Sequence, residues 1–125
     1  FDKRFLEKKI LSLIKKKKIL LHSRSIFLQG LLLEDDISQF NFKKQHIKIF
    51  KEYINNLRKK RLSNVEGCIN FIRLNSKIFE KIIIGFDDEK QLNEIIRCFK
   101  KKKLKYPYNI NCNDIKFLEP RRWKK

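Results

Sequence analysis

Three segments of the chain place apolar side chains at helical spacing, and each of them ends in a run of cations. These segments cover residues 2–18, 43–61 and 87–103. Acidic residues stand where the first and third segments begin, at Asp2 and at Asp87 or Asp88, and they suit the positive end of a helix. The pattern therefore predicts three amphipathic helices, each with a basic C-terminal end.

β-Branched and aromatic residues between these segments predict extended structure. The expected strands are residues 19–29, residues 68–75 and 78–86 (a tight hairpin or one long bent strand), and residues 106–117. Ser63, Asn64 and Gly67 indicate a turn. The order of elements favours an α+β fold, a two-layer sandwich with helices on one face of its sheet and with the helix near 43–61 as an insertion.

The length of the chain fits one domain. Its 125 residues are 42% hydrophobic, which is enough for one packed core. No repeat or low-complexity linker divides the sequence, so residues 1–118 are predicted to form a single α+β domain. Residues 119–125 are then a basic C-terminal tail.

The charge balance points to a polyanionic partner. The chain has 32 Lys and Arg against 14 Asp and Glu, a formal net charge of +18. Self-repulsion at this level destabilises a compact monomer, and bound phosphates would relieve it. One or two cations would suffice to cap each helix, so the surplus at the three helix ends and in the tail predicts RNA phosphate contacts. The predicted contacts of this kind are Lys16, Lys17, Arg58, Lys60, Arg61, Lys101, Lys102, Arg121 and Arg122.

The aromatic residues divide into two groups. Most of the eleven Phe fall on apolar stripes, so each is interpreted as core rather than as a base-stacking residue. Trp123 differs because Arg122 and Lys124 flank it in the basic tail. We expect Trp123 to stack on a base or to anchor the tail against a partner protein.

Other functional classes find little support in the sequence. No Ser, His or Asp stands in a known nucleophile context, so no catalytic residue, cofactor or small-molecule substrate is expected. Cys68, Cys98 and Cys112 lack metal-ligand spacing and are expected to be buried and reduced. The acidic residues 34–36 are interpreted as a solvated loop or a contact for a basic partner rather than a Mg²⁺ site. The apolar runs are too short to span a membrane.

Two stretches resemble the small-ribosomal-subunit protein ten family. Residues 1–7 (FDKRFLE) are similar to the aromatic-Asp-His-Arg-Leu-Leu-Asp stretch that opens the family's first helix. Phe71-Ile72-Arg73 with Lys77 and with residues 82–84 resembles its Phe-Glu-Ile-Arg-Thr-His-Lys-Arg-Leu-Ile-Asp-Ile strand. Between residues 30 and 66 the chain departs from the family and carries the inserted helix. A diverged mitochondrial member, or the family's mitochondrial large-subunit relative, would combine these features.

The resemblance implies a ferredoxin-like sandwich that binds ribosomal RNA and neighbouring ribosomal proteins without catalysis. It adds Arg4, Arg73 and Lys77 to the predicted RNA contacts. The chain has no Ala, Thr or Met and a single Val, which indicates an AT-biased gene and fits an organellar source. The expectation is therefore a structural subunit of a mitochondrial ribosome.

Two other functions stay open. One is a free-standing RNA-binding or RNA-processing module. The other is an interaction subunit that docks on an acidic partner through a basic amphipathic helix such as residues 2–18.

Overall fold

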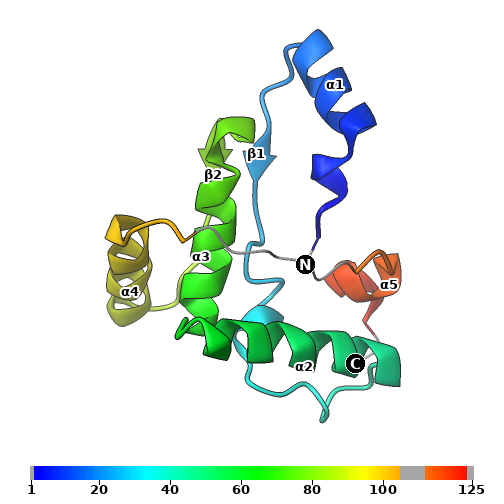
Figure 1. The fold of residues 1–125 in the computed structure, drawn as a ribbon, viewed down its shortest axis with the longest axis vertical. Helices are drawn as coiled ribbons and strands as arrows, with labels where there is room; N and C mark the ends of the chain where they lie inside the picture. Colours follow the sequence, from blue (N-terminus) through cyan, green and yellow to red (C-terminus); the bar gives the residue numbers. More distant parts are fainter. Residues whose placement is uncertain (1, 105–111, 124–125) are drawn as a thin grey trace.

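The computed structural model describes residues 2–104 and 112–123. The α-helices are α1 (Lys8–Lys16), α2 (Lys44–Lys59), α3 (Asn64–Leu74), α4 (Glu89–Lys100) and α5 (Ile115–Leu118). The strands are β1 (His22–Ser23) and β2 (Lys81–Ile82). Short 3₁₀ turns lie at η1 (Arg4–Leu6), η2 (Leu31–Leu33), η3 (Ser76–Ile78) and η4 (Pro120–Arg122). Helices dominate the molecule, with α2 at one end of its long axis and α1 at the other (Figure 1).

The main core lies along α2, and it confirms the helix predicted near 43–61. Phe50, Tyr53, Ile54 and Leu57 follow helical spacing and are buried. They pack against residues from three other segments, namely Leu28, Leu31, Leu32, Ile37, Cys68, Phe117 and Leu118. α2 is therefore the element around which the rest of the fold is assembled.

α3 corrects the expectation of a turn at 63–67 and an extended run at 68–75. Ser63 Oγ accepts a hydrogen bond from Glu66 N at 3.2 Å, and Ser63 N donates to the Glu66 carboxylate at 2.7 Å. This reciprocal capping box satisfies two amide donors that would otherwise be free at the helix start. Ile69 and Ile72, which follow in α3, are buried, and this burial outweighs the preference of isoleucine for strands.

Gly67 lets α3 approach α2 closely and is not a turn residue. A Cβ at this position would lie 2.5 Å from Leu57 Cδ2 and 3.2 Å from the Tyr53 hydroxyl. Such distances are shorter than van der Waals contact, so a Cβ here would have to displace the buried Leu57 side chain or the helix itself.

The sheet is much smaller than predicted. β1 and β2 pair in parallel, with His22 opposite Lys81 and Ser23 opposite Ile82 (Figure 1). The chain leaves β1 through left-handed backbone at Ser25, Leu28 and Gln29, which ends the strand expected over 19–29. In the predicted strand 78–86 only Lys81–Ile82 is a strand, and its partner is β1 rather than residues 68–75. The mixed helix-and-strand class is thus present, while residues 2–104 and 112–123 hold no sheet wider than two strands.

α4 confirms the third predicted helix and builds a second core on the other side of α3. Asp88 caps it by accepting a hydrogen bond from Gln91 N at 2.8 Å. Ile95 and Cys98 pack against Ile69 of α3 in a small cluster separate from the main core. α3 is therefore held between two apolar clusters.

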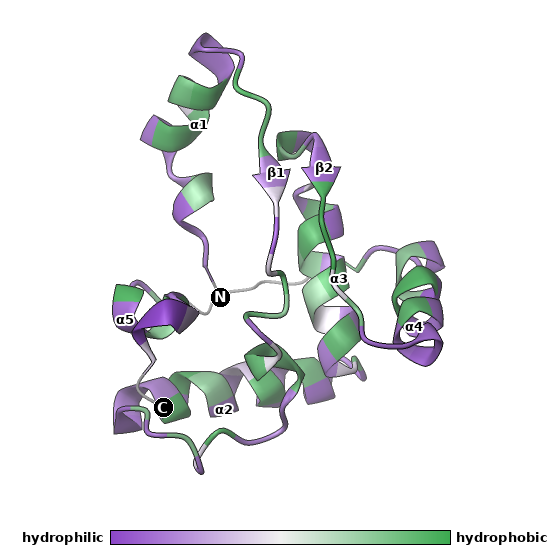
Figure 2. Cartoon of the chain, turned by 180° about the vertical axis from the view of Figure 1, so that it is seen from behind, coloured by the Kyte–Doolittle hydropathy of each residue, from purple (hydrophilic) through white to green (hydrophobic). Residues whose placement is uncertain are grey.

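The first predicted helix is present but starts later than expected. Asp2 binds Arg4 instead of capping a long helix, with Asp2 Oδ1 accepting from Arg4 N at 3.1 Å. Phe5 packs on Phe71 and Phe79, with ring centroids 6.2 and 5.1 Å away. Extended backbone at Glu7 then separates this anchored turn from α1, so α1 leaves the body. No residue of α1 is buried, and its apolar face is visible in Figure 2.

The C-terminal segment is helical where it is described. Asp114 Oδ1 accepts a hydrogen bond from Lys116 N at 2.9 Å and caps α5, so residues 115–117 are not the end of a strand. Residues 106–111 of the strand predicted over 106–117 lie outside the described residues.

Cys68, Cys98 and Cys112 are free and buried, as expected. Burial raises the pKa of the Cys68 thiol to about 11. Among the described residues, no helix is long and apolar enough to cross a membrane.

Candidate nucleic-acid interface

The C-terminal ends of α2 and α4 meet across α3 and form one basic groove. It has a volume of about 330 Å³. The charged residues that line it are Lys60, Arg61, Glu66, Arg73, Lys101 and Lys102. We call it the α2–α4 groove. Five of these residues are cations that the sequence predicted as RNA contacts, and the fold collects them from three segments far apart in the chain.

A Schellman motif places Arg61 at the groove. Leu62 N donates to Leu57 O at 3.0 Å, and Arg61 N donates to Arg58 O at 2.9 Å. The motif requires left-handed backbone at Arg61, which has a φ of 54°. Glycine or asparagine usually fills this position because the left-handed conformation crowds a Cβ. α2 therefore turns sharply enough to bring Lys60 and Arg61 back toward α3.

Side chains of α3 hold the other wall of the groove. Arg73 Nη1 donates to the carbonyl oxygens of Cys98 and Lys101, at 3.1 and 2.6 Å. Asn70 binds Leu104 twice, donating to its carbonyl oxygen at 2.9 Å and accepting from its amide at 3.0 Å. Residues 101–104 are thus fixed on α3 although they contain no regular secondary structure.

Glu66 is the carboxylate among the lining residues of the groove, and it accepts hydrogen bonds from two segments. Lys101 donates a hydrogen bond to it, and so does Ser63 N. These donors, Lys101 first, hold the pKa of Glu66 below its ordinary value, and Glu66 in turn raises the pKa of Lys101. Glu66 therefore stays ionised at neutral pH and offsets one of the positive charges.

The remaining groove cations are available to an anion. Within residues 2–104 and 112–123, Lys60, Arg61 and Lys102 form no ion pair. All three are exposed. An anion in the α2–α4 groove would meet these cations without first breaking an internal contact.

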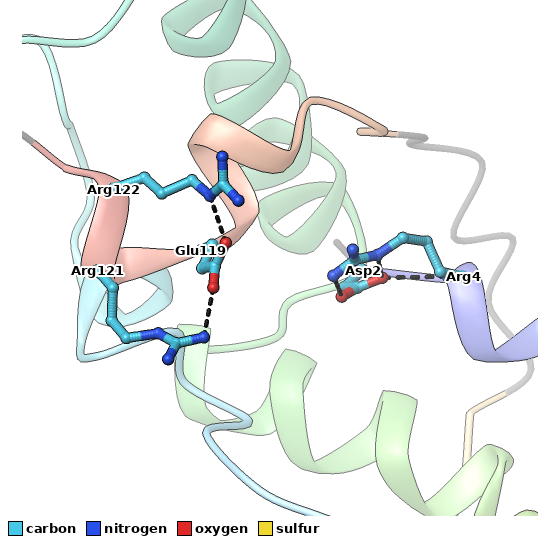
Figure 3. A network of polar contacts seen from close by, with 5 residues as sticks. All are labelled: Asp2, Arg4, Glu119, Arg121 and Arg122. Atoms are coloured by element: carbon cyan, nitrogen blue, oxygen red, sulfur yellow. Dashed lines mark hydrogen bonds and ion pairs between the residues drawn. The ribbon is translucent and has the colours of Figure 1, made fainter.

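The other predicted contacts do not line the groove, and several already have acidic partners. Arg4 pairs with Asp2, while Arg121 and Arg122 share Glu119, as Figure 3 shows. Arg58 pairs with Asp35 and also donates to Leu62 O at 3.0 Å, beside the groove. The acidic residues at 34–36 thus serve internal contacts in part, since Asp36 also accepts a hydrogen bond from Ser38 Oγ at 2.6 Å.

Lys16, Lys17 and Lys77 are exposed and lie elsewhere, the first two at the end of α1 and the third in η3. The fold therefore does not bring these three predicted contacts to the groove.

Trp123 has a structural role that the sequence did not predict. Its Nε1 donates to Phe117 O at 3.0 Å, and its ring packs edge-on against Phe42 with centroids 5.3 Å apart. It is partly buried against the main core, so the tail is docked as far as residue 123.

Two groove residues were missed. Glu66 could have been found from the Ser63-x-x-Glu66 spacing, which is a capping-box signature. Asn70 left no signal in the sequence, because its role depends on a segment more than thirty residues later in the chain.

The groove suits binding of an anion. Clustered Lys and Arg side chains complement phosphate oxygens by charge and hydrogen bonding. The described residues contain no group of three or more His, Cys, Asp and Glu that could hold a metal ion. Comparison with known protein families, curated proteins and solved structures gives no match.

Proposed function

We propose that this chain is a non-catalytic, RNA-binding structural subunit of a mitochondrial ribosome. It binds ribosomal RNA by neutralising phosphates in the α2–α4 groove, and it contacts neighbouring ribosomal proteins. The observation that carries the proposal is the convergence of Lys60, Arg61, Arg73, Lys101 and Lys102 on one groove.

Rigid placement of these cations strengthens the argument. Arg73 and Asn70 fix the backbone of residues 101–104, and the Schellman motif fixes that of Arg61. Ordering a flexible lysine-rich segment on binding would cost conformational entropy. Here the backbone is already ordered before RNA binds, so that part of the cost does not arise. A net charge of +18 supplies the long-range attraction to a polyanion.

The resemblance to the small-ribosomal-subunit protein ten family gives the proposal its ribosomal and mitochondrial part. Its finer implications, a ferredoxin-like sandwich and RNA contacts at Arg4, Arg73 and Lys77, remain expectations. Phe71–Arg73, which resemble a family strand, lie in α3. The RNA-binding part of the proposal therefore rests on the groove and the net charge rather than on that resemblance.

α1 favours a second candidate function, an interaction subunit that docks on an acidic partner. This helix carries an apolar face with Leu13 49% exposed, together with Lys15 and Lys16 in its last turn. RNase treatment separates the two candidates, because a complex held by an acidic protein survives the loss of RNA.

Sedimentation of the tagged native protein in a high-salt sucrose gradient with Mg²⁺ tests the proposal. A ribosomal subunit component migrates with one subunit and leaves that fraction when EDTA unfolds the particle. Recovery at the top of the gradient in high salt, with Mg²⁺ present, would contradict the proposal and favour a transiently bound RNA factor.

A further inference from the structure

A second surface of the chain combines exposed aromatic rings with cations. It is a pocket of about 750 Å³ at the N-terminal end of α2. The lining residues that matter here are Phe40, Phe42, Lys43, Lys116, Arg122 and Trp123. We call it the Phe40 pocket. It shares no lining residue with the α2–α4 groove, which lies at the opposite end of α2.

Phe40 is held in place although it is exposed. Its ring stacks on Phe42, with centroids 5.9 Å apart and planes inclined by 29°. Phe42 itself packs edge-on against both Phe117, at 5.0 Å, and Trp123. Phe40 nevertheless remains 39% exposed, so part of its ring faces solvent on a platform that the core supports.

The backbone around Phe40 is equally constrained. Phe40 N donates to Ile37 O at 3.1 Å, and Phe42 N donates to Phe40 O at 2.7 Å. Ile37 is 0% exposed and anchors the segment on one side, while Phe42 anchors it on the other. An exposed aromatic ring fixed in this way can receive another ring with little loss of entropy.

The charges around the ring favour an anionic occupant. Lys43, Lys116, Arg121 and Arg122 line the pocket, and no described lining residue carries a carboxylate. Asp114 and Glu119 pair with these cations but do not line the pocket. Lys43 Nζ is 3.8 Å from Asp114 Oδ2, and Glu119 pairs with Arg121 and Arg122 (Figure 3). The Lys43 and Arg121 side chains are 62% and 88% exposed, so phosphates can reach them without entering the core.

An aromatic platform beside cations is the arrangement that binds unpaired nucleotides, since a base stacks on the ring while its phosphates meet the charges. We propose that the Phe40 pocket binds one unpaired nucleotide of an RNA strand, with the base on Phe40 and the adjacent phosphates at Lys43 and Lys116. The RNA partner rests on the proposed function. Stacking reads no sequence, so the pocket accepts any exposed base.

The two proposed RNA sites lie at opposite ends of α2 and bind different features of an RNA. α2 has 16 residues, and a helix of that length spans about 24 Å. In this proposal the α2–α4 groove contacts phosphates of a folded region, and the Phe40 pocket binds a single-stranded segment at the other end of α2. A loop or bulge beside an RNA helix presents both features.

Phe40→Ala tests the proposal, with Phe86→Ala as the matched control. Phe86 is also exposed, at 49%, but it lies outside the Phe40 pocket. Both variants are assayed for binding to a fluorescein-labelled oligouridine strand and to an RNA duplex, over a range of salt concentrations. Thermal unfolding of both variants confirms that they are folded, and Lys116→Gln provides a second probe that leaves the aromatic cluster intact.

We expect Phe40→Ala to weaken oligouridine binding about tenfold while leaving duplex binding and the salt slope unchanged. Lys116→Gln should lower the salt slope for oligouridine by about one. Equal oligouridine affinities for Phe40→Ala and Phe86→Ala would overturn the pocket while leaving RNA binding at the groove intact. Uridine monophosphate that competes as well as the strand would also overturn it, because the occupant would be a free nucleotide. Failure of the wild-type protein to bind either RNA would instead refute the proposed function.

Discussion

Arg61 occupies a backbone conformation that costs free energy for any residue except glycine. Its φ of 54° lies in the left-handed region, where an L side chain is disfavoured by about 1 kcal/mol or more. The Schellman motif at the end of α2 needs this conformation but not an arginine. On the proposed function, Arg61 adds a cation to the α2–α4 groove that glycine would not supply.

Arg61→Gly should therefore stabilise the fold and weaken RNA binding at the same time. We expect the free energy of unfolding to rise by up to about 1 kcal/mol, since the strain relieved exceeds the entropy that glycine adds to the unfolded chain. Arg61→Gln is the control, with the same loss of RNA affinity and unchanged stability in chemical denaturation. If Arg61→Gly were less stable than Arg61→Gln, the strain argument would fail.

Glu66 is a residue whose charge opposes the proposed function while its hydrogen bonds support the fold. In Glu66→Gln the side chain can still complete the capping box of α3, because glutamine serves at that position as well as glutamate. Removing the carboxylate frees Lys101 for phosphate. We expect tighter RNA binding and a steeper salt dependence, measured by fluorescence anisotropy.

The same variant also has a pH signature. The pKa of Glu66 is lowered in the folded state, so its ion pair stabilises the protein above the ordinary carboxyl pKa, and this stabilisation is lost as pH falls through the lowered value. Glu66→Gln should therefore lose less stability on acidification than the wild type. Identical pH profiles would contradict the role of the Lys101 pair.

Among the elements, α2 and α4 could be predicted from the sequence and α3 could not. The apolar stripes of α2 and α4 are regular, and Asp88 marks the start of α4 as expected. In α3, four consecutive buried residues, Gly67 to Asn70, replace a one-sided helical stripe, and Gly67 resembles a turn residue. Its fit against Leu57 exists only once α2 and α3 are packed.

Gly67→Ala tests that packing. Helix propensity alone would favour alanine by about 1 kcal/mol, whereas the clash with Leu57 must be relieved by shifting that buried side chain or by moving α3 away from α2. We expect a net destabilisation of about 1–2 kcal/mol in chemical denaturation. Gly85→Ala is the matched control with no expected effect, since nothing lies within 4 Å of the added Cβ. A stabilised Gly67→Ala protein would show that the crossing is looser than described.

α1 should be the least stable helix of the fold in the absence of a partner. It has 9 residues and none of them is buried, so it lacks the packing that stabilises short helices in water. Hydrogen exchange should show fast amide exchange in α1 and slow exchange in α2 and α3. Added RNA should slow exchange in α1 if Lys16 and Lys17 are contacts. Strong protection of α1 in the free protein would mean that its apolar face is covered.

At the scale of the whole molecule, the convergence of the basic runs on one groove could not be predicted from the sequence pattern. The basic runs at the ends of α2 and α4 were visible in the sequence, and their excess charge predicted phosphate contacts. Their meeting across α3 depends on a Schellman motif without glycine and on hydrogen bonds from Asn70 and Arg73. The extended run predicted at 68–75 was wrong for a similar reason, because tertiary burial made residues 68–74 helical.

The salt dependence of RNA binding tests the central claim most directly. Replacing Lys60, Arg61 and Lys102 with Gln removes three exposed groove cations that have no ion pair in the described structure, while replacing the exposed Lys48, Lys81 and Lys90 with Gln removes the same charge elsewhere. The account predicts that the slope of log affinity against log salt becomes shallower by about 2 to 3 in the groove variant and by much less in the control. Equal changes in the two variants would show that net charge, and not the α2–α4 groove, binds the RNA.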